Sequence, residues 1–188
     1  PDIVYAGDLR GNLWKFDMGA TDAALWNVAF TGRPLYSAVY TSGNASSAQP
    51  ITAAPIVKVN DRDGRGLMVA FGTGRNITEG DRTDVSVQTL YSMLDSTLYR
   101  VTSGVVSVDT TNGQPQPVGT GFGSLQQQTV SATAIAGSGA SSARTFFTVS
   151  QNTVAFTGSN ARKGFYLHLP EAGERLLGSL SFFDGSNI

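Results

Sequence analysis

The first seventeen residues, Pro1 to Asp17, constrain the fold of this chain more than any other stretch. Two short apolar runs, Ile3 to Ala6 and Leu13 to Phe16, flank the segment Gly7-Asp8-Leu9-Arg10-Gly11-Asn12. Glycine tolerates the positive φ angles that a tight reversal requires, so this pattern predicts a β-hairpin. A strand ending in Gly-Asp, a glycine turn and an aromatic strand closing on Asp are typical of hairpins that repeat in propeller blades.

Length and charge limit the classes of protein to consider. The 188 residues, 40% of them apolar, can bury one substantial core, which predicts a single domain or a large piece of one. A net charge of −1 with 14% charged residues provides no basic face for nucleic acid or anionic lipid. No apolar run reaches the roughly 20 residues of a membrane helix, so no transmembrane segment is expected. The absence of cysteine excludes disulfides and thiolate metal sites.

The two ends of the chain contain none of the spare residues that usually fray at natural termini. There is no initiating Met, and a strand is expected from residue 3. We therefore expect residues 1–188 to be part of one domain that is truncated at both ends, so a missing signal peptide does not count against export.

The remaining pattern predicts an all-β chain. Period-2 runs such as Ile56 to Val59 and Leu67 to Phe71 recur between clusters of turn residues, whereas no long 3.6-residue stripe is present. One short helical turn is expected at Ala20 to Trp26, capped by Thr21 or Asp22.

A weak internal repeat organises the expected strands. Val69 to Gly72 with Leu90 to Asp95 repeats the pattern of the first hairpin, and Phe146 to Val149 with Gly164 to Leu169 gives a looser third copy. A plain four-stranded blade takes about 40–45 residues, so about four blades or fewer fit in the chain. The sequence thus predicts a fragment of a β-propeller with antiparallel blades.

The aromatic residues divide into two groups. Those on expected strands should pack in the core between blades, namely Trp14, Phe16, Tyr91, Phe146, Phe147, Phe165 and Tyr166. Trp26, Tyr36 and Tyr40 lie in less regular sequence, where exposed rings could contact a partner, although single exposed apolar residues are ordinary. Loops rich in Gly, Ser, Asn, Gln and Pro are expected at residues 41–49, 74–83, 110–128 and 137–142.

Two acidic segments are candidates for binding. Asp61, Asp63 and Gly64 imitate the front half of a calcium loop, but no carboxylate follows where the bidentate ligand would lie, and a hairpin turn explains the same residues. A second segment contains Glu79, Asp81, Arg82 and Asp84. It could hold a metal or a substrate, or it could be a solvated loop linked by Arg75 or Arg82, which is the more common arrangement.

Enzyme chemistry has little support in the residues. The single histidine, His168, lies on an expected strand beside Tyr166, while Phe165, Leu167 and Leu169 share the other face. One histidine without cysteine assembles neither a triad nor a histidine-based metal site. The string Gly72-Thr73-Gly74-Arg75 superficially resembles a phosphate loop, but no Gly-Lys-Ser/Thr follows, so a turn leaving a strand is favoured.

Four strings, in order along the chain, resemble the C-terminal propeller of the PilC/PilY family. They are VYAGDLRGNLWKFD (residues 4–17), ITAAP (51–55), VAFGTGRNITEGDRTDVSVQTLYSMLD (69–95) and GFYLHLPEAGER (164–175). The resemblance spans most of the chain and is weakest between residues 96 and 142. His168 departs from the acidic residue expected at its place in the last string, which puts a family role of that carboxylate in doubt.

The resemblance implies a modified, seven-bladed β-propeller that is not catalytic. Members of the family are type IV pilus biogenesis and tip-associated proteins of Gram-negative bacteria, which balance pilus extension against retraction and contribute to adhesion and twitching motility. Many carry a calcium loop directly before the Val-Tyr-Ala-Gly-Asp strand, and only Asp2 here matches it, as the final carboxylate. Calcium requires six to eight oxygens, so Asp2 alone cannot hold it, and Asp2 is otherwise an exposed carboxylate at a strand end.

The expected protein is therefore a non-catalytic pilus biogenesis factor and tip adhesin, modulated by calcium in its full-length form. Its expected partners are pilus components, meaning major or minor pilins, and host or abiotic surfaces, without nucleic acid. Its expected location is exported, at the pilus tip, outer membrane or cell surface. The alternatives are a quinoprotein-like propeller dehydrogenase, which the repeat alone would suit, and a lectin-like binding propeller.

Overall fold

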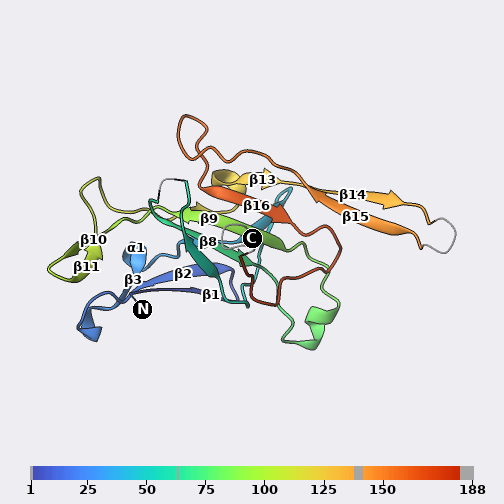
Figure 1. The fold of residues 1–188 in the computed structure, drawn as a ribbon. Helices are drawn as coiled ribbons and strands as arrows, with labels where there is room; N and C mark the ends of the chain where they lie inside the picture. The colour runs from blue at the N-terminus through green and yellow to red at the C-terminus, as the bar shows by residue number, and fades with distance from the viewer. Residues whose placement is uncertain (1, 63, 138–141, 183–188) are drawn as a thin grey trace.

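Strands dominate the fold of the computed structural model, which describes residues 2–62, 64–137 and 142–182 (Figure 1). The first five-stranded sheet contains β1 (Ile3–Gly7), β2 (Asn12–Asp17), β3 (Asn27–Val28), β4 (Tyr36–Ser37) and β12 (Gly119–Thr120). The second contains β7 (Ile56–Val59), β8 (Leu67–Gly72), β9 (Thr89–Asp95), β13 (Gln126–Gln128) and β16 (Gly164–His168). Together these two sheets form the body of the molecule.

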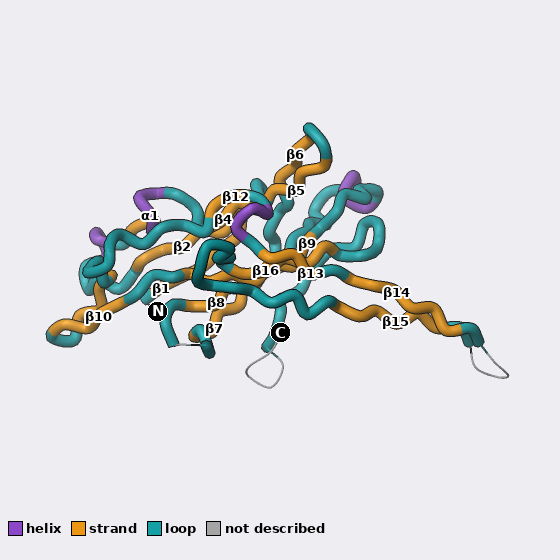
Figure 2. Tube along the Cα trace, turned by 90° about the horizontal axis from the view of Figure 1, so that it is seen from above, coloured by secondary structure: helices purple, strands orange, loops and turns teal. Residues whose placement is uncertain are grey.

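Two-stranded hairpins and short helical turns complete the fold. The hairpins pair β5 (Val39–Ser42) with β6 (Ala45–Ala48), β10 (Tyr99–Thr102) with β11 (Val105–Val108), and β14 (Val130–Ile135) with β15 (Arg144–Val149). The helical turns are α1 (Ala29–Gly32) and the 3₁₀ turns Ala23–Leu25, Glu79–Arg82 and Phe122–Ser124. Figure 2 shows the β14–β15 hairpin projecting from the body, with β10–β11 on the opposite side.

The order of strands confirms an all-β fold with mainly antiparallel pairing. The first sheet runs β1-β2-β4-β12, with β3 also on β2, and the second runs β13-β16-β9-β8-β7. Only the short pairs β4–β12 and β13–β16 are parallel among the described strands. The sheets do not join into a closed ring within the described ranges, as expected if these residues make up part of a propeller.

The opening hairpin forms as predicted. β1 pairs with β2 in the register Tyr5 to Lys15, and Gly11 in the turn has a φ of 79°. The Asp8 carboxylate closes the turn by accepting hydrogen bonds from Arg10 N, Asn12 N and Trp14 Nε1 at 2.8–2.9 Å. Partial burial opposes ionisation of Asp8, but the bonds from the Trp14 and Asn12 side chains outweigh it and lower its pKa.

The core lies between the facing sides of the two sheets. Alternate residues of β8 and β9 point inward, as the period of two for a strand requires. Tyr36 of β4 contacts both Phe71 and Tyr91 across the interface, with ring centroids 6.3 and 5.2 Å apart. The buried cluster consists of Leu13, Phe30, Leu35, Tyr36, Ala38, Ile51, Val69, Phe71, Tyr91, Met93, Val118, Leu125 and Tyr166. This cluster fixes the two sheets against each other.

The first two copies of the repeat are confirmed, and the third is wrong. β8 pairs with β9 as β1 pairs with β2. By contrast, β15 pairs with β14, and β16 pairs with β9, because the second sheet takes its next strand from far along the chain. Phe146 and Phe147 therefore lie outside the core, 50% and 48% exposed.

Other expectations had mixed outcomes. A 3₁₀ turn forms within residues 20–26, and Asp22 caps it by accepting from Ala24 N at 2.9 Å. Ile56–Val59 and the β8 strand form the predicted hairpin. Residues 41–49, expected as a loop, mostly form the β5–β6 hairpin.

Tyr36 is fully buried, so its predicted role as an exposed contact is wrong, whereas Trp26 is 46% exposed.

Candidate functional site

Asp2, the one predicted metal ligand, lies exposed directly before β1. Its backbone oxygen accepts a hydrogen bond from Met18 N at 2.9 Å, which fastens the start of β1 to the end of β2. The described residues contain no group of three or more His, Cys, Asp or Glu side chains arranged to hold a metal ion. These residues alone therefore do not fit calcium, which takes six to eight oxygen ligands.

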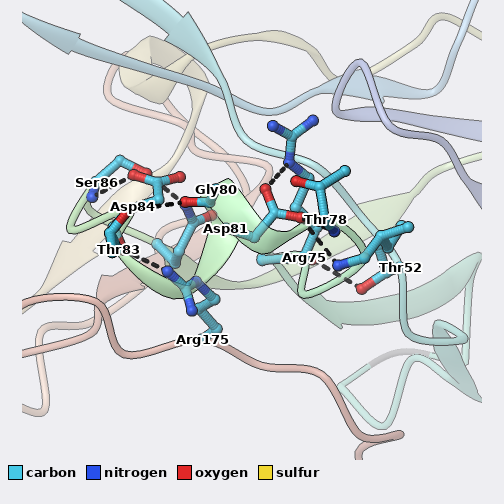
Figure 3. Close-up of polar contacts among 12 residues, drawn as sticks. Thr52, Arg75, Thr78, Gly80, Asp81, Thr83, Asp84, Ser86 and Arg175 are labelled. Carbon is cyan, nitrogen blue, oxygen red and sulfur yellow. Dashed lines mark hydrogen bonds and ion pairs between the residues drawn. The ribbon is translucent and has the colours of Figure 1, made fainter.

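The loop after β8 is the most highly organised polar feature of the surface. Asp81 lies at its centre and is 2% exposed. Its carboxylate accepts from Arg75 Nε at 2.7 Å, Ile77 N at 2.9 Å and Thr78 N at 2.8 Å. Figure 3 shows Arg75 and Thr78 beside Asp81. The backbone bonds from Thr78 and Ile77, with the bond from Arg75, hold the pKa of Asp81 well below its usual range.

The second half of this loop is hydrogen-bonded to the C-terminal segment of the chain. Arg175 donates from Nη2 to the backbone oxygen of Asp84, and the Asp84 carboxylate accepts from Ser86 N at 2.8 Å (Figure 3). The bonds from Ser86, helped by the charges of Arg175 and Arg75, lower the pKa of Asp84. The prediction of a loop cross-linked by Arg75 is confirmed, and Arg175 is a partner that the sequence did not indicate.

The base of the same loop is held by a separate segment of the chain. Thr52 Oγ1 donates to Gly74 O at 2.7 Å, and Gly74 N donates to Pro50 O at 2.8 Å. Leu176 N donates to Thr73 O at 3.0 Å. Three segments that are far apart in sequence are thus joined by hydrogen bonds around this loop, namely residues 51–55, 72–86 and 175–176. We call these three segments together the motif loop frame.

The motif loop frame carries two large apolar side chains on its surface. Ile77 is 66% exposed and Val85 is 67% exposed. The backbone on either side of each is fixed by the bonds of Asp81 and Asp84, so little ordering entropy remains to be lost when a partner binds. A rigid loop with exposed apolar side chains can bind a protein surface.

The only histidine, His168, is half-buried within an aromatic and polar network. His168 packs against Tyr40, Phe122 and Tyr166, with ring centroids 5.3, 5.0 and 5.1 Å away. Its Nδ1 lies 3.0 Å from Thr89 Oγ1, which itself accepts from Gln49 Nε2 at 2.8 Å. Thr89 Oγ1 thus links Gln49 and His168 in one polar chain. Burial lowers the pKa of His168, and the ring acts as a packed structural group.

A buried ion pair that sequence reasoning missed joins the two sheets. Lys15 Nζ of β2 donates to Asp95 Oδ2 of β9 at 2.5 Å, and both side chains are 1% exposed. Tyr5 OH and Thr97 Oγ1 donate to the same carboxylate, each at 2.6 Å. The sequence did contain an indication that Lys15 faces the core. Lys15 lies two residues after the buried Leu13, so both share the inward face of β2.

The turn between β7 and β8 is a structural feature. Asp61 pairs with Lys58, and Asn60 Nδ2 donates to Arg65 O at 3.0 Å, so the turn is closed by its own residues. Asp63, the other candidate ligand, lies outside the described residues. Gly72 ends β8, and Gly74 forms an isolated parallel bridge with Ile51 where a turn was predicted.

Comparison with known proteins agrees with this geometry. A family model described as the PilY1 beta-propeller domain matches residues 1–136. A protein named type IV pilus biogenesis factor PilY1 from Pseudomonas aeruginosa is 38% identical over 187 residues, covering 88% of this chain. A PilY1 homolog from Xylella fastidiosa is 40% identical over 94 residues, covering 50% of the chain.

A solved structure gives the same answer for the fold. The crystal structure of the Pseudomonas aeruginosa PilY1 C-terminal domain matches with a TM-score of 0.69 and 33% identity, over 95% of this chain and 38% of that one. The fold and its strand-end loops thus define a part of a β-propeller domain. The chain belongs to the PilY1 β-propeller family. It spans 15% of the length of the full Pseudomonas relative and 7% of the Xylella one.

Proposed function

We propose that this chain is part of a type IV pilus biogenesis factor that acts by binding at the pilus tip or outer cell surface. Its similarity to PilY1 proteins of that name supports the proposal. The protein would be exported, would contact major or minor pilins and host or abiotic surfaces, and would regulate pilus extension, retraction, twitching and attachment. Among the described residues, no helix is long and apolar enough to cross a bilayer.

The motif loop frame is the part of the chain that we assign to contact with a pilus component. The observation that carries this assignment is the exposure of Ile77 and Val85 on a backbone fixed by Asp81, Asp84 and Arg175. Exposed apolar side chains on a prepared backbone give more binding free energy than the same side chains on a loop that must first order.

The test introduces charge at these positions in the full-length protein within its own bacterium. Ile77→Glu and Val85→Glu should reduce the number of surface pili and the diameter of the twitching zone, while the level of the protein stays unchanged. Val101→Glu is the matched control, since Val101 is also an exposed β-branched residue, 69% exposed on β10. Equal pilation in all three variants would contradict the assignment of the loop.

Binding, rather than catalysis, is the mode of action that the described residues favour. His168 is packed against three rings, and the Asp81 and Asp84 carboxylates are already occupied by bonds from the loop itself. Nothing in the described geometry specifically favours a quinoprotein-like dehydrogenase. A redox-active absorbance after incubation of the full-length protein with pyrroloquinoline quinone and calcium would overturn this proposal.

Calcium modulation is a separate proposal for the longer protein, and it rests on Asp2 and the family resemblance. Asp2 supplies one exposed carboxylate, so the other ligands would have to come from outside the described residues. Calorimetric titration of the full-length protein with calcium should show binding that Asp2→Ala weakens. Glu171→Ala is the control, because Glu171 is also an exposed carboxylate and lies far from Asp2 in the sequence. Absence of calcium binding would refute this proposal without affecting the pilus role.

A further inference from the structure

A cavity of about 350 Å³ lies between the first sheet and the β10–β11 hairpin, away from the motif loop frame. Figure 1 shows β10–β11 beside α1 and β3. The end of β2 and the α1 turn form one wall of the cavity, Tyr99 and Val108 form the other, and residues 114–116 form the lip. The volume falls within the range of about 300–1,000 Å³ that is typical of small-molecule sites.

The α1 turn at this cavity has an unusual backbone. Phe30 and Thr31 have φ angles of 54° and 58°, and Gly32 follows at 79°. Side chains with a Cβ rarely adopt this left-handed region, and such outliers cluster at ligand sites. The turn is held by Thr31 Oγ1 and Arg33 Nε, which donate to Phe30 O at 2.6 and 3.2 Å. It directs the Phe30 ring inward and leaves Thr31 and Arg33 exposed on the cavity wall.

The floor of the cavity has balanced charges. Lys15 is neutralised by Asp95, and its Nζ lies 5.3 Å from the Phe30 ring and 5.2 Å from the Tyr99 ring. Of the remaining charged groups that line the cavity, Asp17 is an anion and Arg33 is a cation. A charged ligand would be attracted by one of these two groups and repelled by the other. The site therefore favours a neutral polar molecule.

The lip supplies groups that both donate and accept hydrogen bonds. Gln114 and Gln116 of the lip, and Asn27 of β3, line the cavity with side-chain amides. Asn27 Nδ2 and Gln116 Nε2 each donate one hydrogen bond to the backbone, to Leu25 O and Gln114 O. An amide can donate to one hydroxyl and accept from its neighbour, which suits adjacent hydroxyl groups on a ring. Deeper in the cavity, the Phe30 and Tyr99 rings lie against Lys15 Nζ and make part of its lining apolar. The Tyr99 hydroxyl is buried without a hydrogen-bond partner among the described residues.

We propose that this cavity binds a neutral saccharide, with its hydroxyl groups on the amides of Asn27, Gln114 and Gln116. This site is separate from the motif loop frame and does not depend on it. The saccharide could belong to a bacterial surface glycan or to a host glycan, and both present the same hydroxyl chemistry.

The test uses the full-length protein on an array that contains neutral and acidic glycans from bacterial and mammalian sources. The wild-type protein should bind neutral glycans, and the source of the bound glycans distinguishes the two origins. Asn27→Ala and Gln116→Ala should each weaken binding of the selected glycan at least tenfold in calorimetric titration. Both residues are exposed, so the melting temperature should not change.

Gln151→Ala is the matched control, since Gln151 is an exposed amide that does not line the cavity. It should bind as the wild-type protein does. The proposal is overturned if no neutral glycan binds, if only acidic glycans bind, or if the two cavity variants bind like the control. None of these results would alter the effect of Ile77→Glu on pilation, so the saccharide proposal and the pilus proposal are tested independently.

Discussion

Lys15 of β2 and Asp95 of β9 form a buried ion pair, with Nζ 2.5 Å from Oδ2, that connects the two five-stranded sheets. Burial lowers the pKa of Lys15, and Asp95 opposes that shift. Burial alone would raise the pKa of Asp95, but Lys15, Thr97 and Tyr5 outweigh it and lower it. The Asp95 carboxylate has four hydrogen-bond donors in all.

Removal of one partner of this pair should be strongly destabilising. Lys15→Met leaves an uncompensated carboxylate in the core, which should reduce the free energy of unfolding by about 3–5 kcal/mol. Chemical denaturation of the purified protein measures this loss. Lys58→Met is the control, because Lys58 pairs with the exposed Asp61 and should cost about 1 kcal/mol or less. Similar losses in the two variants would show that Lys15 contributes no more than a surface charge.

The sequence predicted the local strand pairs but not which distant strands meet. The β1–β2 and β8–β9 hairpins could be recognised because alternation and turn residues are local signals. The prediction of the third repeat was wrong because β16 follows β15 in sequence but pairs with β9. Phe146 was assigned to the core because it lies on an expected strand, but that strand is exposed. Long-range pairing depends on tertiary packing, which a local pattern does not contain.

The contacts of the candidate site were also predicted only in part. The link between Arg75 and the acidic loop was expected because the two lie close in sequence. Arg175 was missed, since nothing local connects it with Asp84. The buried Lys15 was also missed, because lysine usually faces solvent. Its position two residues after Leu13 was the available sign that it faces the core.

His168 should make stability depend on pH below neutrality. Its pKa is lowered in the folded state, so below about pH 6.5 the unfolded chain binds a proton that the folded chain does not. The free energy of unfolding should therefore fall as pH drops from 7 to 5, with the unfolding equilibrium changing at most about tenfold per pH unit. It is the only histidine, and the carboxylates lose their contribution only at lower pH, below about 4.5.

Urea denaturation at pH 7 and pH 5 measures this dependence. His168→Gln should be less stable than the wild-type protein at pH 7, because the ring contacts are lost, but its stability should change less between the two pH values. A pH dependence of the same size in both proteins would place the responsible group elsewhere.

Gly72 should not tolerate a side chain. A Cβ at Gly72 would lie 2.2 Å from Leu176 Cβ, where the C-terminal segment crosses the end of β8. Gly72→Ala should therefore cost about 1–3 kcal/mol through overpacking, or displace that segment and the Arg175 bond to Asp84. Gly80→Ala is the control, because nothing lies within 4 Å of its added Cβ. Thermal unfolding of both variants measures the difference, and equal melting temperatures would contradict the close packing.

The β14–β15 hairpin should be dispensable for folding. Figures 1 and 2 show it projecting from the body, and the described residues of both strands are exposed or, at Val130, half-buried. Replacing residues 131–148 by an Asn-Gly turn keeps the Val130–Val149 pair, removes the exposed Phe146 and Phe147 and leaves the core cluster intact. We expect the melting temperature to stay within about 3 °C of the wild-type value, since surface changes usually alter stability by less than about 0.5 kcal/mol. As a control, removing the β10–β11 hairpin should destabilise the protein, because Tyr99 packs beside Lys15. A large loss on deletion of β14–β15 would mean that this hairpin supports the body.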